Sequence, residues 1–247
     1  MNFGELFSAS WTELKFKFKV NSRIVFYFMF IPGLIALVLT SLSFYTQNNL
    51  FDYLSLAVQI IAIFTGILAS TSLIYSTIFD KKDYDSSVSG GKKFYWRFIG
   101  LMLVQIIFLI LLLFALIIPA IIFAVYWSLA EFVFIKENKG IIESLRGSFR
   151  LIRNNWWKVV GYGILIGIIS LGISVLFSIP SWPTNMMIFI DAIKNPTLYL
   201  DGAPATNLST INEAITGFFS LLSQLIIVPL SIIFSKYLYF ALQKKKK

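Results

Sequence analysis

The sequence lacks two residue types altogether, because none of its 247 residues is a cysteine or a histidine. Their absence excludes disulfide bonds, zinc sites of the usual kind, haem ligation by histidine, and catalytic nucleophiles that depend on either side chain. The sequence also has no pair of carboxylates at catalytic spacing and no set of metal ligands. We therefore expect a protein that is not an enzyme and that uses neither a cofactor nor a metal ion.

Charged residues are also scarce in this chain. They make up 13% of the sequence, whereas soluble domains carry about 25%. Hydrophobic residues make up 57%, and the mean hydropathy is +0.79. These values indicate an integral membrane protein. The net charge is +9, but the cations follow the membrane topology described below, so we expect no nucleic-acid partner.

Apolar runs of membrane-spanning length divide the chain. As a single helix, the run 98–135 would be about 57 Å long, nearly twice the thickness of the hydrocarbon core. It must therefore cross twice or re-enter, with Pro119 as the turning point. The first run begins near Arg23 and lacks a signal-peptide cleavage site, so we expect it to remain in the protein. The six predicted transmembrane helices are 24–45, 54–79, 98–118, 120–135, 159–179 and 214–239.

The segments between these helices are predicted to lie outside the hydrocarbon core. Residues 1–20 have apolar side chains at helical spacing, which predicts an amphipathic helix at the interface, with lysines that reach the lipid headgroups. Those lysines are Lys15, Lys17 and Lys19. Residues 80–97 are predicted to form a charged loop, and 181–213 the longest loop. Gly163 and Gly167 are predicted to pack closely on a neighbouring helix.

The distribution of cations predicts the orientation in the membrane. Of the 21 lysine and arginine residues, all but Lys194 fall in segments that six crossings place on the same side. Segments rich in lysine and arginine face the cytoplasm. We therefore expect an all-α integral membrane protein of the cell inner membrane, with one multi-pass domain over 1–247 and both termini in the cytoplasm.

A basic amphipathic segment, 138–157, lies between the fourth and fifth predicted helices. Helical spacing places an apolar stripe on one face of this segment and a row of cations beside it. Asn138 is predicted to cap its N-terminus. The stripe consists of Ile141, Ile142, Leu145, Phe149, Ile152 and Trp156, and the cations are Lys139, Arg146, Arg150 and Arg153.

Two interpretations of this segment are open. The apolar stripe can lie in the headgroup layer, with the cations in contact with anionic lipid or a partner. It can instead pack on the protein's own helices, and the arginines then only follow the orientation rule. We expect the fold to have amphipathic interfacial helices at the N-terminus and between helices four and five.

Four polar side chains form a second candidate site. Glu131 is the only acid well inside an apolar run, which makes it a candidate for proton or ion transfer. An ion pair with Lys136 or Arg153 is the alternative for this carboxylate. Three glutamines also lie within predicted spanning helices, namely Gln59, Gln105 and Gln224. They can form a polar site with Glu131 or simply donate interhelical hydrogen bonds.

Three motifs together resemble one family. They are FGELFSASW near the start, IIPAII at the turn of the long run, and AEFVFIKENKGIIESLRGSFRLIRNNWWK before the fifth helix. The combination resembles the six-helix membrane domain of some bacterial glycerophosphoryl diester phosphodiesterases and related bacterial membrane proteins of unknown function. In those phosphodiesterases a separate soluble barrel carries the catalytic histidines, which have no counterpart here. The resemblance therefore implies the membrane fold and not the enzyme activity.

Two functions of different classes follow from these features. The leading hypothesis is a non-enzymatic accessory or scaffold protein whose basic helix engages anionic lipid, another membrane protein or a second copy of the chain. The alternative is a small transporter or channel that uses Glu131 and the intramembrane glutamines. A membrane-embedded lipid enzyme is the least favoured class, because histidine and cysteine are missing.

Overall fold

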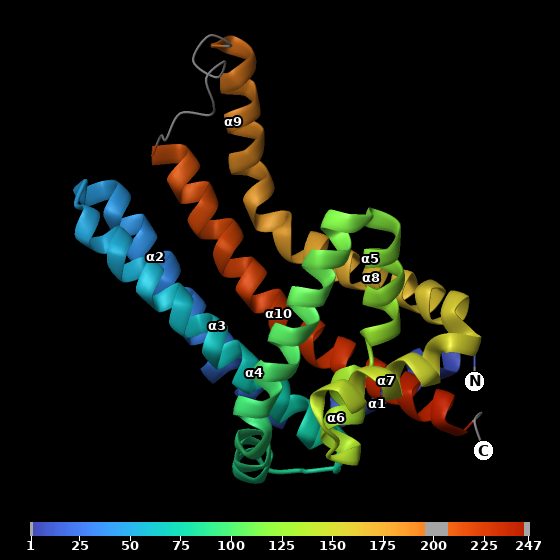
Figure 1. Ribbon diagram of the computed structural model, residues 1–247. Coiled ribbons are helices and arrows are strands. Elements are labelled where there is room, and N and C mark those ends of the chain that lie inside the picture. Colours follow the sequence, from blue (N-terminus) through green and yellow to red (C-terminus); the bar gives the residue numbers. More distant parts are fainter. Residues whose placement is uncertain (1, 196–206, 245–247) are drawn as a thin grey trace.

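The computed structural model describes residues 2–195 and 207–244, and within these ranges all regular elements are helices (Figure 1). Six stretches are long and apolar enough to cross a membrane, which confirms the predicted number of candidate spans. The α-helices are α1 (Phe3–Val25), α2 (Ile31–Thr46), α3 (Asn49–Ile78), α4 (Tyr84–Ala115), α5 (Ile117–Trp127), α6 (Ala130–Glu137), α7 (Ile141–Ile152), α8 (Trp156–Ser178), α9 (Trp182–Lys194) and α10 (Asn207–Lys244).

The N-terminal helix is continuous with the first span. Helices α1 and α2 are joined by one π-helical segment, Phe26–Phe30, and no break separates 1–20 from 24–45. The π-helical segment ends two residues before Pro32, whose ring nitrogen cannot donate a hydrogen bond to the preceding turn. Helix α1 buries Leu14 against the α10 side chains of Leu230 and Ile233. One face of α1 therefore packs on the protein itself.

The connection between α3 and α4 is shorter than predicted. Helix α4 already begins at Tyr84, so the prediction of a loop over 80–97 is wrong for most of its length. Gly90 and Gly91 indicated a loop, but here they allow α4 to approach α3 closely. A Cβ atom on Gly91 would lie 2.7 Å from backbone atoms of Ser72, a distance that real Cβ atoms do not reach.

The fourth span, Ile117–Glu137, is broken between α5 and α6. Ser148 of α7 bridges the break, because its hydroxyl donates to the Tyr126 carbonyl at 2.6 Å and accepts from the Leu129 N–H at 3.3 Å. The Gln105 side chain donates to the carbonyl of the last residue of α5 at 3.2 Å. Side chains of α7 and α4 thus satisfy backbone groups that the break releases.

The region after α8 contains more helix than predicted. Helix α9 follows α8 after a single 3-10 turn, and α10 begins at Asn207, so 181–213 is not one long loop. The expected close packing at Gly163 and Gly167 is absent from the part of the chain that the structure describes. No atom of a neighbouring element lies within 4 Å of a Cβ placed on either glycine.

The main core lies at the end of the molecule where α1 begins and α10 ends. Figure 1 shows α1, α6 and α7 at this end, together with parts of α3, α4 and α10. The largest cluster of buried apolar side chains joins these elements and includes Phe98, Phe134 and Tyr239. At the other end, the α2–α3 pair and α9 diverge from each other (Figure 1). Helix α7 is therefore held by the most compact part of the fold.

Candidate functional site

A tight turn between α6 and α7 sets the start of the basic helix. Asn138 has a φ of 47°, in the left-handed region that asparagine tolerates, and it ends α6. Arg97 of α4 donates to the Asn138 Oδ1 at 3.0 Å and to the Lys139 carbonyl at 3.2 Å. Gly140 caps α7, and its N–H donates to the Glu143 carboxylate at 3.4 Å. The prediction of Asn138 as the N-cap is therefore wrong.

The apolar stripe of α7 serves two purposes. Leu145 and Ile152 are buried in the main core, and Ser148 holds the break in the fourth span. Ile142 remains exposed, and the Phe149 ring packs 4.4 Å from the Tyr126 ring, measured between centroids. The packing interpretation thus describes part of the stripe, and the placement of the rest in the headgroup layer stays a prediction. One edge packs on the protein's own helices, and the other edge remains accessible.

Three arginines beside this stripe lack a carboxylate partner. Arg146, Arg150 and Arg153 are exposed, and within 2–195 and 207–244 none of them forms an ion pair. Lys139 differs, because its ammonium pairs with the Glu137 carboxylate. Arg150 and Arg153 lie at the C-terminal end of α7, where the helix dipole favours positive charge. The exposed positive charge of α7 and its C-cap therefore comes from guanidinium groups.

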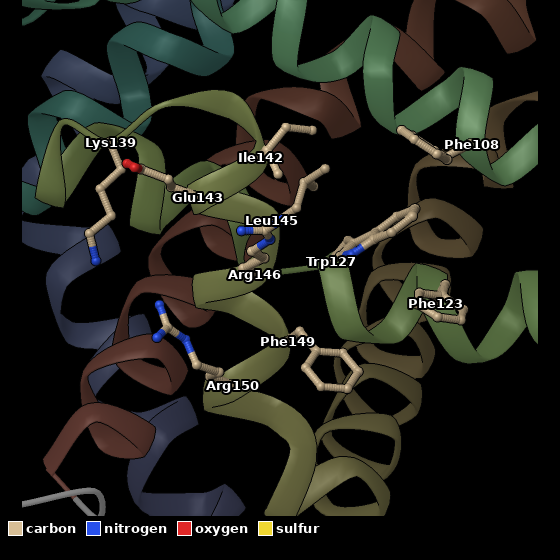
Figure 2. A pocket seen from close by; sticks show the side chains of 10 residues that line it. All are labelled: Phe108, Phe123, Trp127, Lys139, Ile142, Glu143, Leu145, Arg146, Phe149 and Arg150. Atoms are coloured by element: carbon tan, nitrogen blue, oxygen red, sulfur yellow. The ribbon is translucent and has the colours of Figure 1, made fainter.

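A cavity of about 670 Å³ lies against Lys139, Arg146 and Arg150. Figure 2 shows aromatic side chains on one side of the cavity, the Lys139 and Arg150 side chains on the other, and Arg146 between them. The aromatic residues come from α4, α5 and α7, so three helices build the walls. The full lining is Phe108, Phe123, Trp127, Lys139, Ile142, Glu143, Leu145, Arg146, Phe149 and Arg150. A site of this composition suits a molecule with an anionic part and an apolar part.

A second cavity, of about 800 Å³, follows along α5 toward the start of α8. Its apolar wall comes from the N-terminal half of α5 and its polar wall from the segment that joins α7 to α8. The indole of Trp156 donates to the Ile122 carbonyl at 3.4 Å and so fastens the two walls together. The lining includes Ile118, Ile121, Tyr126, Arg153, Asn154 and Trp157.

Glu131 lies in the first turn of α6, directly after the break in the fourth span. Within the described ranges this carboxylate forms no ion pair, so the expected contact with Lys136 or Arg153 is not present. The Lys136 ammonium lies instead over the rings of Phe79 and Phe240, at 5.3 and 5.8 Å from their centroids.

Among the described residues, no hydrogen bond joins the three glutamines to Glu131. Gln59 donates to the Ser55 hydroxyl at 3.1 Å, which in turn hydrogen-bonds to Thr40 of α2 at 2.8 Å. Gln105 binds the end of α5, and Gln224 of α10 makes no hydrogen bond within the described residues. The glutamines with partners thus act as interhelical hydrogen-bond donors or as local packing groups.

A buried charged cluster joins α1, α10 and the end of α3, and it was not predicted. The Lys17 side chain is only 3% exposed, and its ammonium lies 2.7 Å from the Asp80 carboxylate and 3.4 Å from that of Glu13. It also donates to the Ser76 carbonyl at 3.3 Å, while Glu13 pairs with Lys236. The prediction that Lys17 reaches the headgroups is therefore wrong. The hydrogen bond from Lys17 and its charge lower the pKa of Asp80 below the ordinary value of 3.8.

The spacing of this cluster was a signal that sequence reasoning could have used. Glu13 and Lys17 are four residues apart on one helical face. The same face carries Leu6, Ser10 and Leu14, which are buried together with Lys17. A charged side chain on the apolar face of a helix needs a partner of opposite charge when it is buried. Among the described residues, however, no group of three acidic side chains is placed to hold a metal ion.

Comparison with protein families gives one match, over residues 54–242, which contain α7 and both cavities. No curated protein and no solved structure matches the chain significantly. The resemblance to the membrane domain of glycerophosphoryl diester phosphodiesterases therefore receives no support from these comparisons. Because the matched region covers most of the sequence, the chain belongs to the family described as a domain of unknown function (DUF7847).

Proposed function

We propose that this protein is a non-enzymatic accessory or scaffold protein of the cell inner membrane that engages anionic lipid through α7. One observation carries the proposal. Three exposed arginines without carboxylate partners in the described chain lie along a helix whose flank opens into a cavity with aromatic walls. Phospholipids combine an anionic headgroup with apolar chains, and this combination matches both parts of the cavity lining.

The energetics favour a phosphate-bearing lipid. Arginine donates two parallel hydrogen bonds to a phosphate, a geometry that lysine cannot supply. Each cation near an anionic membrane surface contributes about 1 kcal/mol to binding, so three arginines contribute about 3 kcal/mol, or roughly a hundredfold in affinity. The rings of Phe108, Phe123 and Trp127 offer apolar surface that an acyl chain can cover.

We also propose that α7 and both termini face the cytoplasm. The concentration of all cations but Lys194 in segments on one side supports this orientation. The start of α1 and the end of α10 lie at the same end of the molecule as α7, as six crossings require (Figure 1). A reporter that is active only in the periplasm should be inactive when fused after Lys139 and active after Asn195. The reverse pattern would overturn the orientation.

Native mass spectrometry of the full chain released from its own membranes tests the lipid proposal. We expect the wild type to retain anionic lipid, and the double variant Arg146→Ala with Arg150→Ala to lose most of it. The matched control is Lys92→Ala with Lys93→Ala, which removes two exposed cations of α4 that form no ion pair within the described residues.

Equal lipid retention by both double variants would refute lipid binding at α7. Retention of a membrane protein that is lost only from the arginine variant would assign the same surface to a protein partner. A second copy of the chain bound in the same way would show up as a dimer mass that the arginine variant loses.

One observation favours a second function, a small transporter or channel. The fourth span is broken next to Glu131, and broken spans with half-helix ends near a polar group are typical of transport sites. The scattered positions of the glutamines count against it. A transporter requires that Glu131→Gln abolish flux in proteoliposomes while the thermal stability stays unchanged. A lipid-engaging scaffold requires that this variant bind lipid as the wild type does.

A further inference from the structure

The two cavities beside α7 are neighbours along α5. Phe123 and Trp127, near the C-terminal end of α5, line the first cavity, whereas the second is lined by isoleucines of the N-terminal half of α5 and by Tyr126. Phe149 lines the first cavity, Tyr126 lines the second, and their rings are in contact at 4.4 Å between centroids. One aromatic pair thus forms the wall that the cavities share.

The guanidinium groups are divided between these cavities. Arg146 and Arg150 line the first cavity, and Arg153 lines the second. Arg150 and Arg153 are three residues apart, and residues at this spacing are neighbours on a helical surface. The second cavity has no carboxylate in its lining, while Glu143 of the first also accepts a hydrogen bond from the backbone of Gly140. Each cavity therefore presents net positive charge beside an apolar wall.

We propose that one lipid with two phosphates occupies both cavities, and this inference rests on the proposed lipid-binding function. One phosphate binds Arg146 and Arg150, the other binds Arg153, and the link between the phosphates crosses over the Phe149 and Tyr126 rings. The acyl chains of the first half lie on Trp127 and its aromatic neighbours, and those of the second half lie on the isoleucines of α5.

A single lipid with two phosphates fits better than two separate anionic lipids for two physical reasons. The covalent link makes binding of the second phosphate intramolecular, which raises its effective concentration. Two separate lipids would instead have to bring like charges together without any compensation from such a link. Basic surfaces at the cytoplasmic side of membrane helices are known to bind headgroups of this class.

The test is competition between two defined lipids on the delipidated full chain in detergent, followed by native mass spectrometry. The probes are tetraoleoyl cardiolipin, which has two phosphates, and dioleoyl phosphatidylglycerol, which has one. At equal phosphate concentration we expect one cardiolipin per chain, bound at least about tenfold more tightly than phosphatidylglycerol, a difference of about 1.4 kcal/mol.

The variant Arg153→Ala should abolish this preference, because it removes the guanidinium that binds the second phosphate and so weakens cardiolipin binding more than phosphatidylglycerol binding. Arg153→Gln serves as a second variant at the same position, and Lys92→Ala is the control for loss of one exposed charge. Two phosphatidylglycerol molecules bound as tightly as one cardiolipin would overturn the inference of a single ligand and leave the proposed function intact. If cardiolipin and phosphatidylglycerol bind no more tightly than dioleoyl phosphatidylcholine, which is neutral overall, the single-ligand inference and the proposed function would both be overturned.

Discussion

The buried charged cluster gives the sharpest prediction about stability. Replacement of Glu13 by glutamine removes the carboxylate that pairs with Lys17 and Lys236, whose side chains are only 3% and 9% exposed. Lys17 keeps the Asp80 carboxylate and the Ser76 carbonyl as partners. Lys236 keeps its position over the Tyr237 ring, but its ammonium loses the carboxylate with which it pairs in the described chain and which offsets its burial.

The magnitude follows from the burial of this pair. Removal of one partner from a buried ion pair costs about 3–5 kcal/mol, because the remaining charge is desolvated without compensation. We expect the lower end, about 3 kcal/mol, because Glu13 is 11% exposed and Lys17 remains paired. For a chain of this size, that loss lowers the thermal midpoint by about 6–12 °C.

Thermal unfolding of the full chain in detergent, followed by tryptophan fluorescence, measures this loss. Glu213→Gln is the control, because Glu213 is exposed and has no ion pair in the described part of the chain. The double variant Glu13→Met with Lys236→Met should recover most of the stability, since apolar side chains replace a buried pair at little cost. A midpoint for Glu13→Gln within about 2 °C of the wild type would refute the reasoning, because it corresponds to less than about 1 kcal/mol.

Three further predictions concern packing and pH. Ser148→Ala should lower the stability by about 1–3 kcal/mol in the same unfolding assay, because it leaves backbone groups at the break in the fourth span unpaired. The control Ser144→Ala loses only a hydrogen bond to the Gly140 carbonyl at the start of α7, so its loss of stability should be smaller. Gly91→Ala should lower the stability by about 1–3 kcal/mol, whereas Gly163→Ala, which has open space around it, should be neutral or stabilising. If Gly163→Ala proved less stable than Gly91→Ala, that result would contradict the close contact of α3 and α4. Because the pKa of Asp80 is lowered in the folded state, its contribution to stability is present above pH about 4 and is lost as the pH falls through the lowered pKa. The difference in free energy of unfolding between wild type and Asp80→Asn, below about 1 kcal/mol because the Asp80 side chain is exposed, should therefore vanish in acid.

The spans were predictable from the sequence because hydropathy and length decide them. The six candidate spans and the helical class follow from apolar runs alone, without knowledge of which helices meet. The start of α4 was missed because it depends on which helices meet. Gly90 and Gly91 read as a loop when taken locally, and only the neighbouring helix with Ser72 shows that they serve close packing.

The candidate site was predictable only in part. Helical periodicity identified the arginines of α7, since they lie within one segment. The cavity could not be predicted, because Phe108 comes from α4, Trp127 comes from α5, and the sequence does not say that these helices meet α7. The buried cluster was missed because Lys17 and Lys236 also satisfy the orientation rule, which explains a cation near a membrane without asking whether it is buried.

The types of cation indicate that α7 has a role beyond orientation. The orientation rule treats lysine and arginine alike, so it predicts no preference for either on one helix. Yet three of the five arginines in the sequence, Arg146, Arg150 and Arg153, lie on α7 or at its C-cap, while lysines dominate the other cationic segments. The lysines of the buried cluster are paired, as burial requires, whereas these arginines have no carboxylate partner in the described chain. Charge alone does not favour guanidinium over ammonium groups at these positions, whereas the bidentate recognition of a phosphate that we propose does favour them.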